Sequence, residues 1–406
     1  MTDLLLISII LIVSVILSQN VGCMPQSALE NEANLEDMSQ LSELNNFNDY
    51  TMDIQPNTGL YPSLCGVLSN STLSGNVLCP RGWISLKNET LCNLPDTTNI
   101  HPCTTQVDER RVQFRSYDVE SLLCRNKNLH CLGNVIIPGN VQSLSLKYNK
   151  LSDGIELKET LSHLSELVAI SLASNNFLPL TTSLFEFNLE LREVDLSMNF
   201  ILDLPENLFF NNAKLKTVFL VGNQIQYLPW YLFSRNRRLE VVSFQRNNIS
   251  YFPVDLFYDN PRLRLINFAN NNIEDVPPES FARNEDLREI NISGNKLRKI
   301  FHNFLSTSTN LEVLSMSYNN IFSIPELFLA NCMSLEYVNL AYNNLVTLPI
   351  RWLHNHRKLE TIDLAGNHLL SVPDGAFQNS PKMNVRGIGQ DRHNLRKFAS
   401  ENMIYL

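Results

Sequence analysis

The sequence predicts an α/β solenoid, in which short parallel strands stack into one curved sheet and irregular or short helical return arms join them. Three observations predict this fold. Apolar residues recur at an interval of about 24 residues, within the range of known solenoid repeats. An Asn occupies one fixed place in each recurrence, and a second apolar set recurs between the strands. One such unit cannot bury its own apolar face, so the units are stable only as a stack.

The strand motif comes first along each unit. From residue 141 onward the chain repeats the pattern LxxLxLxxNxL, as in Leu191, Val194, Leu196 and Ile201. Apolar residues at the fourth and sixth positions alternate with polar ones, which predicts a short strand with one buried face. The ten units begin at Val141, Leu167, Leu191, Leu215, Leu239, Leu263, Leu287, Leu311, Leu335 and Leu359. This pattern is the signature of leucine-rich repeats.

The ninth position of every unit is Asn. A buried turn leaves backbone groups unpaired, and an Asn amide carries both a donor and an acceptor for them. The sequence therefore predicts a structural ladder of Asn side chains that bridge the turns of neighbouring units. Its members are Asn149, Asn175, Asn199, Asn223, Asn247, Asn271, Asn295, Asn319, Asn343 and Asn367.

The return arms repeat a second motif, LPxxLFxxN, for example in residues 204–212. Its aromatic position is predicted to form a stack along the convex side, where each buried Phe or Leu contributes about 1.5–3 kcal/mol. The residues at this position are Phe209, Phe233, Phe257, Phe281 and Phe377, with Leu305, Leu329 and Leu353 between them.

Both ends of a solenoid expose core and need caps. Residues 61–140 are predicted to be the amino-terminal cap, held by three disulfides among Cys65, Cys79, Cys92, Cys103, Cys124 and Cys131, with fifteen possible pairings. A zinc site is the weaker alternative, because no Cys-x2-Cys pair occurs. The repeats span 141–382. After Met383 the pattern decays, so 383–406 either form a degenerate cap or end before a natural one.

Residues 1–23 predict export. The apolar run from Leu4 to Leu17 reaches about 21 Å as a helix, short of a roughly 30 Å bilayer core, which favours a cleaved signal peptide over an uncleaved anchor. No second apolar run of about 20 residues follows, so we expect a secreted, extracellular chain without a membrane span. The sequons at Asn70, Asn88, Asn248 and Asn291 agree with export. A glycan on Asn291 would stand on the concave face.

Residues 24–60 hold seven acidic residues and no Lys or Arg, which predicts an acidic disordered tail. They account for most of the net charge of −9, and the remainder is close to neutral. The charge therefore does not support binding to nucleic acid.

The repeat unit with its LPxxLF motif resembles the insect-type leucine-rich repeats of Toll receptor ectodomains. Cys79-Pro80 and the run Cys92-Asn93-Leu94-Pro95 are similar to their amino-terminal cap. The resemblance covers roughly residues 61–380 and implies ligand recognition in an immune or developmental pathway, including a role as a soluble decoy or competitor. Residues 1–406 contain no run that matches the membrane span or the signalling domain of those receptors, so we expect no signalling by this chain itself.

No catalytic constellation is evident, so we expect a binding protein without cofactor or metal rather than an enzyme. His354 and His356 are interpreted as variants of a return-arm turn, and Cys332 as a buried, inert thiol. The acidic pairs Glu193/Asp195 and Glu360/Asp363 are interpreted as a solvated face.

Binding is expected on the concave face, where side chains leave the sheet without building the core. An exposed apolar patch is predicted from Phe219, Val221, Val241 and Leu265, bordered by Arg246 and Arg264. Tyr318, Tyr337 and Tyr342 form a second, smaller candidate. The second positions change from basic to acidic along the stack: Arg192, Lys216, Glu240, Arg264, Arg288, Glu312, Glu336, Glu360. Ordinary scatter of side chains on a sheet is the competing interpretation of all three features.

The predicted function is recognition of a protein ligand or receptor in innate immunity. The alternative is an extracellular matrix or adhesion protein built on the same scaffold. The sequence leaves the oligomeric state open.

Overall fold

The computed structural model describes residues 120–387, apart from 131, 133–134, 153, 179, 351, 355, 374–375 and 378–382, together with short strands at 89–91 and 112–113. The chain divides into Met1–Thr58 and Gly59–Leu406, and all described residues belong to the second unit. The predicted signal peptide, the acidic tail and most of the cap lie outside the described residues.

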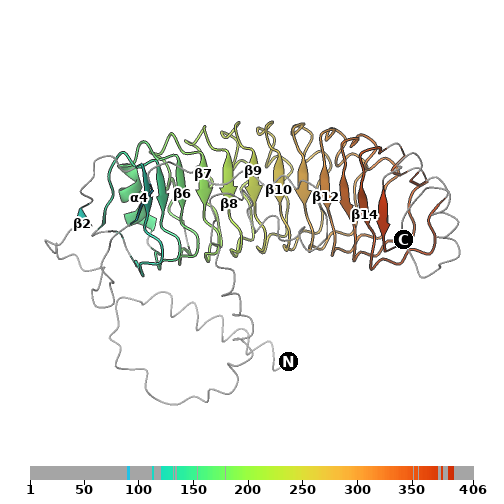
Figure 1. Cartoon of the computed structure of the whole chain (residues 1–406), viewed down its shortest axis with the longest axis horizontal. Coiled ribbons are helices and arrows are strands. Elements are labelled where there is room, and N and C mark those ends of the chain that lie inside the picture. Colours follow the sequence, from blue (N-terminus) through green and yellow to red (C-terminus); the bar gives the residue numbers. More distant parts are fainter. Residues whose placement is uncertain are drawn as a thin grey trace, which may run out of the picture. The chain divides into compact units, whose positions relative to one another are not determined.

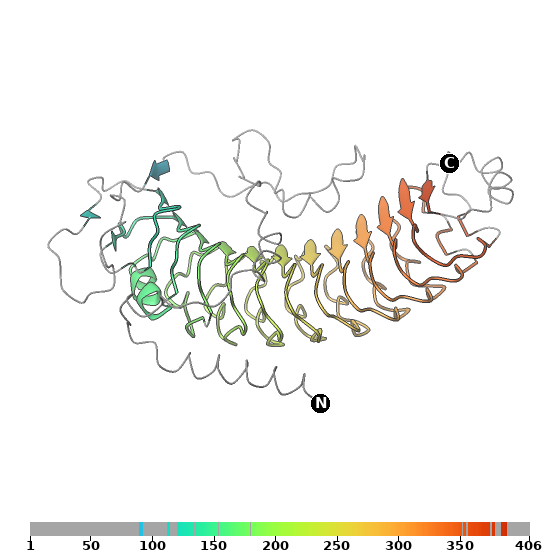
Figure 2. The same ribbon diagram turned by 90° about the horizontal axis from the view of Figure 1, so that it is seen from below.

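A single parallel sheet of 13 strands runs through the second unit in the order β1-β3-β5 to β15 (Figure 1). Each repeat supplies one short strand, at its third to fifth positions. The repeat strands are β5 Ser143–Ser145, β6 Ala169–Ser171, β7 Glu193–Asp195, β8 Thr217–Phe219, β9 Val241–Ser243, β10 Leu265–Asn267, β11 Glu289–Asn291, β12 Val313–Ser315, β13 Tyr337–Asn339 and β14 Thr361–Asp363. Equivalent residues pair across neighbours, as Val218 does with Val242, so the period of the sequence is also the register of the sheet. Figure 2 shows these strands side by side along the concave side of the stack.

The sheet continues past the repeats at both ends. β1 (Glu89–Leu91) and β3 (Ser121–Leu123) come from the predicted amino-terminal cap, and β15 (Asn384–Arg386) follows the last repeat. A separate two-stranded sheet pairs β2 (Val112–Gln113) with β4 (Val135–Ile136). Helix α4 (Gly154–Ser162) lies in the return arm of the first repeat, which is longer than the repeats that follow it.

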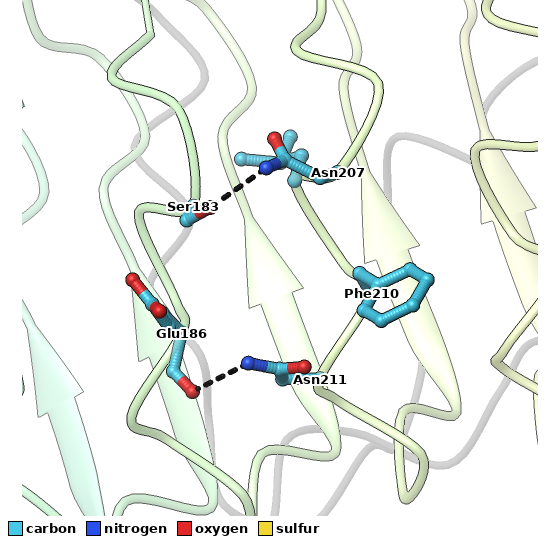
Figure 3. Close-up of a pocket in the computed structure, with 6 residues that line it drawn as sticks. Ser183, Glu186, Asn207, Phe210 and Asn211 are labelled. Carbon is cyan, nitrogen blue, oxygen red and sulfur yellow. Dashed lines mark hydrogen bonds between the residues drawn. The ribbon is translucent and has the colours of Figure 1, made fainter.

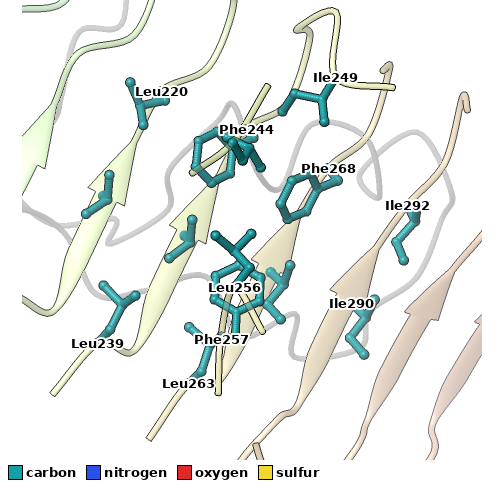
Figure 4. Close-up of a cluster of buried hydrophobic side chains, with 14 of the residues drawn as sticks. Leu220, Leu239, Phe244, Ile249, Leu256, Phe257, Leu263, Phe268, Ile290 and Ile292 are labelled. Atoms are coloured by element: carbon teal, nitrogen blue, oxygen red, sulfur yellow. The ribbon is translucent and has the colours of Figure 1, made fainter. Parts of the chain in front are cut away.

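The core lies between the sheet and the return arms. The strand-motif residues Leu215, Val218 and Leu220 are fully buried, as are their counterparts along the stack. Figure 4 shows Phe244 and Phe268, which directly follow the neighbouring strands β9 and β10, and Phe257 of a return arm, whose ring centroid is 6.3 Å from that of Phe268. The ring centroids of Phe244 and Phe268 are 5.1 Å apart. The apolar periodicity of the sequence is therefore the periodicity of the core.

The aromatic stack of the return arms is present and longer than predicted, because it begins at Phe185. From Phe185 through Phe209, Phe233 and Phe257 to Phe281, successive rings are 5.8–6.4 Å apart and within 4–23° of parallel. The stack then passes to Phe304 and Phe328, one residue earlier in the motif, while Leu305 and Leu329 take the original position. The Leu-Phe pair of the earlier return arms thus becomes Phe-Leu at 304–305 and 328–329, so the ring moves to the neighbouring position.

No helix within the described residues is long and apolar enough to cross a membrane.

Candidate functional site

The Asn ladder ties each strand turn to its neighbours. Asn271 Nδ2 donates to the carbonyl of Phe244 at 2.9 Å and to that of Phe268 at 3.0 Å, while its Oδ1 accepts from the Ile249 amide at 3.1 Å. The other nine ladder residues make equivalent bonds, from Asn149 to Asn367. In every ladder residue Nδ2 donates and Oδ1 accepts a hydrogen bond, so these residues are structural.

A second column of buried Asn runs through the return arms, and the sequence analysis did not identify it. Its members donate to carbonyls of the preceding repeat, as Asn260 Nδ2 does to Phe233 at 3.0 Å and to Asn236 at 2.9 Å. The column comprises Asn188, Asn212, Asn236, Asn260 and Asn284. The Asn in the repeated LPxxLFxxN motif was the available signal for it.

The eighth position of every repeat has a left-handed backbone, with φ between +53° and +68°. Gly occupies it in three repeats, and the other seven place a side chain where an L-residue is strained by about 1–2 kcal/mol. The positions are Tyr148, Ser174, Met198, Gly222, Arg246, Asn270, Gly294, Tyr318, Tyr342 and Gly366. Where the next repeat has Gly, the side chain leans toward it: a Cβ on Gly222, Gly294 or Gly366 would meet Met198, Asn270 or the Tyr342 ring, the last at 2.6 Å.

The first predicted patch is contiguous but not exposed. Phe219, Val241 and Leu265 form one cluster across β8, β9 and β10, and they are only 7%, 7% and 4% exposed. The expectation of exposure was wrong for these three because they pack against one another across neighbouring strands. Val221 is half-buried, and Arg246 and Arg264 are exposed at the border as predicted.

The cluster is followed along the third positions by Glu289, which is 5% exposed. Burial raises the pKa of this carboxyl to about 7. Its ionised form is therefore disfavoured in this buried position.

The second predicted patch keeps two exposed members. The rings of Tyr318 and Tyr342 stack at 4.4 Å and 12°, and the residues are 59% and 52% exposed. Tyr337 was also expected to be exposed, but it is 9% exposed because it lies within β13 between neighbouring strands. Burial is the larger cause of the raised pKa of Tyr337, and the nearby Asp363 carboxylate adds to it.

Charges along the second positions form pairs at the middle of the stack and an unbalanced row at its end. Lys216 lies 2.8 Å from Glu240, and Arg288 lies 3.1 Å from Glu312. Burial and the flanking carboxylates of Glu312 and Glu360 raise the pKa of Glu336. Because Glu312 is paired with Arg288, the unbalanced carboxylates are Glu336 and Glu360 of the last two repeats, and the tyrosine pair lies beyond the other end of β12 and β13.

Two of the four sequons fall within the described residues. Asn248 is exposed, whereas Asn291 is 2% exposed and its Oδ1 accepts from the Ser293 amide at 3.1 Å. A sugar on Asn291 has no room in the folded sheet. Asn70 and Asn88 lie outside the described residues.

Of the six cap cysteines, only Cys124 is described; it is buried and disulfide-bonded, and its partner lies outside the described residues. The three-disulfide pairing stays a prediction.

The residues considered for chemistry have structural surroundings. Cys332 is fully buried, and burial raises the pKa of its thiol to about 12, as the interpretation of an inert thiol requires. His356 is buried with Nε2 at 3.0 Å from the Leu329 carbonyl. No group of three metal-ligating residues occurs within the described part of the chain. The interpretation of a solvated face was wrong for Asp195, which is 6% exposed; its carboxylate lies 3.0 Å from Lys147 Nζ and accepts from the Ser171 hydroxyl.

One shallow hollow lies between the second and third return arms and is lined by Ser183, Glu186, Asn207, Phe210 and Asn211 (Figure 3). Asn207 Nδ2 donates to the Ser183 hydroxyl at 2.8 Å, and Asn211 Nδ2 donates to the Glu186 carbonyl at 3.2 Å. These amides bridge adjacent arms, so the hollow shows no group poised for catalysis.

With this geometry in view, the fold is the leucine-rich-repeat solenoid. Residues 237–297 and 309–369 match the family model described as "Leucine rich repeat". A search of curated proteins finds no match.

Solved structures share the fold at low sequence identity. The functional domain of InlJ from Listeria monocytogenes is 18% identical with a TM-score of 0.52, over 66% of this chain and 53% of that one. TLR13 in its complex with ssRNA13 is 20% identical with a TM-score of 0.50, over 64% of this chain and 40% of that one. The APL1 leucine-rich-repeat domain is 17% identical with a TM-score of 0.50, over 66% and 73%. This chain thus spans about half of the length of the InlJ chain and less than half of the TLR13 chain. The Toll-like resemblance is met at the level of the repeats and the fold.

Proposed function

We propose that this chain is a secreted leucine-rich-repeat protein that recognises a protein ligand or receptor in innate immunity through the concave face of its last three repeats. The observation that carries the proposal is the Tyr318–Tyr342 stack. Two large rings are stacked and held exposed at the eighth positions of neighbouring repeats. Exposed aromatic side chains are also enriched among interface hot spots.

The surroundings of the pair favour a protein partner over a nucleic acid. In the repeats that carry the tyrosines, Glu312 and Glu336 directly precede β12 and β13, and Glu360 precedes β14; Glu312 is paired with Arg288. A row of carboxylates repels phosphate, and nucleic-acid binding depends on neutralising it. The ssRNA named with TLR13 therefore does not suggest the ligand of this chain. The similarity of fold to TLR13 and APL1 and the apolar leader support a role outside the cell in recognition.

The test replaces each exposed tyrosine with glycine. Because φ is +53° at Tyr318 and +55° at Tyr342, glycine relieves strain there and should leave the fold intact. In a pull-down from extracellular fluid, we expect Tyr342→Gly and Tyr318→Gly to lose at least about tenfold of the captured partner, or about 1.4 kcal/mol.

Tyr148→Gly is the matched control, because Tyr148 is 53% exposed at the same repeat position with φ +57°. It should capture normally. Retention that is the same in all three variants would remove the tyrosine pair as the site. Retention of matrix components alone would replace the immune role with an adhesion role.

A further inference from the structure

A second surface lies on the return arms rather than on the concave face. Tyr227, Trp230, Tyr251 and Val254, here called the lateral patch, belong to the fourth and fifth repeats. The three aromatic residues are 64%, 61% and 62% exposed, and Val254 is 40% exposed. By contrast, Trp352, which lies two residues later in its return-arm motif, is 1% exposed. Exposed apolar clusters of this kind mark interaction surfaces.

The four side chains are neighbours because of the repeat. They occupy the thirteenth and sixteenth positions of two adjacent units. In the eighth and ninth units the same positions, Ser323, Glu326, Thr347 and Ile350, line one shallow hollow. In the fourth and fifth units these same two positions are occupied by the aromatic side chains and Val254 of the lateral patch.

Trp230 is held in position by its neighbour. The Tyr231 ring meets it edge-on, with centroids 4.7 Å apart and planes at 81°. The Tyr231 hydroxyl in turn donates to the Glu206 carboxylate of the preceding repeat. An exposed indole with a fixed orientation binds a partner at a lower cost in conformational entropy.

The charges around the lateral patch have one sign. At the twelfth, thirteenth, sixteenth and seventeenth positions of the third to sixth repeats there are six carboxylates and no Lys or Arg: Asp203, Glu206, Asp255, Glu274, Asp275 and Glu279. Among the ion pairs of the described residues, only Asp275 has a cation, Lys299, at 3.9 Å. Some carboxylates elsewhere on the surface are neutralised by the next repeat, as Glu190 is by Lys214 at 2.6 Å.

Two other exposed rings already carry a cation. Arg235 lies over the Phe210 ring at 5.0 Å, and Arg283 lies over the Tyr258 ring at 5.1 Å. In the described structure, no Lys or Arg covers Tyr227, Trp230 or Tyr251. Aromatic faces and unpaired carboxylates together are what a guanidinium or ammonium group requires.

We propose that the lateral patch binds an Arg- or Lys-bearing segment of a protein partner, with the cation over the aromatic rings and the flanking carboxylates around it. This surface is separate from the tyrosine pair and does not depend on the function proposed for that site. A neutral oligosaccharide would also use aromatic rings, but it would gain nothing from six carboxylates of one sign.

The test uses the full-length chain with Asn248→Gln, since that sequon lies just before Tyr251. Hexa-arginine is titrated by calorimetry at low salt, with hexa-glutamate and chitohexaose as the other probes. The acidic segment 24–60 also attracts basic peptides, so dependence on the lateral patch decides the outcome. We expect Trp230→Ala, and separately Asp255→Asn with Glu274→Gln, to weaken hexa-arginine binding about tenfold, with the affinity falling as salt rises.

Tyr258→Ala and Glu285→Gln are the matched controls, an exposed ring and an exposed carboxylate outside the lateral patch, and both should bind as the parent does. Thermal melting checks that each variant is folded. Hexa-arginine binding that ignores Trp230→Ala overturns the proposal. Binding of chitohexaose that depends on Trp230, without such binding of hexa-arginine, replaces it with a glycan site.

Discussion

The two columns of buried Asn differ in how strictly the chain keeps them. The ladder after the strands is Asn in all ten repeats, while the return-arm column is Asn in five and then becomes Ser308, Cys332 and His356. Both columns donate to backbone carbonyls. The difference lies in the other half of the amide. Ladder residues such as Asn271 accept from a backbone amide through Oδ1, whereas Oδ1 of the return-arm Asn residues has no partner.

A position whose side chain only donates tolerates other residues: Cys332 and His356 keep one donation, while the Ser308 hydroxyl has no hydrogen-bond partner. Cys332 Sγ lies 3.7 Å from the Leu305 carbonyl, and His356 Nε2 lies 3.0 Å from the Leu329 carbonyl, in the direction that Asn Nδ2 takes in earlier repeats. A position that donates and accepts in fixed directions admits only a primary amide of this length. How strictly the repeats keep one residue type at a position therefore follows the number of hydrogen bonds that its side chain makes, and not how deeply it is buried.

The largest effect is expected from Asn271→Ala. The change leaves the Phe244 and Phe268 carbonyls short of a donor and the Ile249 amide without an acceptor. A buried unpaired group costs about 1–3 kcal/mol, and we expect a total loss of about 3 kcal/mol in the free energy of unfolding. Denaturant titration measures it. A loss under about 0.5 kcal/mol, below the contribution of a typical single hydrogen bond, would show that the ladder is hydrated.

A smaller loss, about 1–2 kcal/mol, is expected from Asn260→Ala. Two carbonyls lose a donor, but no backbone amide is orphaned, and an unpartnered Oδ1 is removed. The same titration applies. Equal losses for Asn260→Ala and Asn271→Ala would break the distinction between the two columns.

The ladder was predictable from the sequence because Asn occupies the ninth position of every repeat. One residue type at one position implies that its side chain makes the same hydrogen bonds in each repeat. The left-handed eighth position was not predictable, since only Gly222, Gly294 and Gly366 signal it and seven side chains conceal it. The candidate sites divide in the same way. Register correctly predicted that Phe219 and Leu265 share a cluster, but exposure depends on the volumes of neighbouring side chains, which a pattern does not contain. The lateral patch was missed because its residues occupy return-arm positions that differ from repeat to repeat.

A gain is expected where the return-arm column has its weakest donor. Cys332→Asn should raise the free energy of unfolding by about 1 kcal/mol, because an amide replaces a weak thiol donor with two hydrogen bonds. The native thiol provides a second measurement. With its pKa raised to about 12 by burial, Cys332 should escape alkylation at pH 8 until the chain unfolds, as peptide mapping can show. Labelling of the folded protein at Cys332 would mean that this end of the stack opens readily.

The smallest effect is expected from His356→Asn. The imidazole makes one bond, to the Leu329 carbonyl, and its buried Nδ1 has no partner. By the register of the column, an Asn would donate to this carbonyl and to that of Cys332, as Asn260 does to the two equivalent carbonyls. The additional bond contributes about 1 kcal/mol, and the smaller side chain loses roughly half of that in packing. A net gain of about 0.5 kcal/mol would raise the melting temperature by roughly 1–2 °C.

The control is His302→Asn, at an exposed return-arm position, which should leave the melting temperature unchanged. A loss of about 1 kcal/mol or more in His356→Asn would mean that the last repeats have adapted their packing to the imidazole, and that the column is set by volume there rather than by donors.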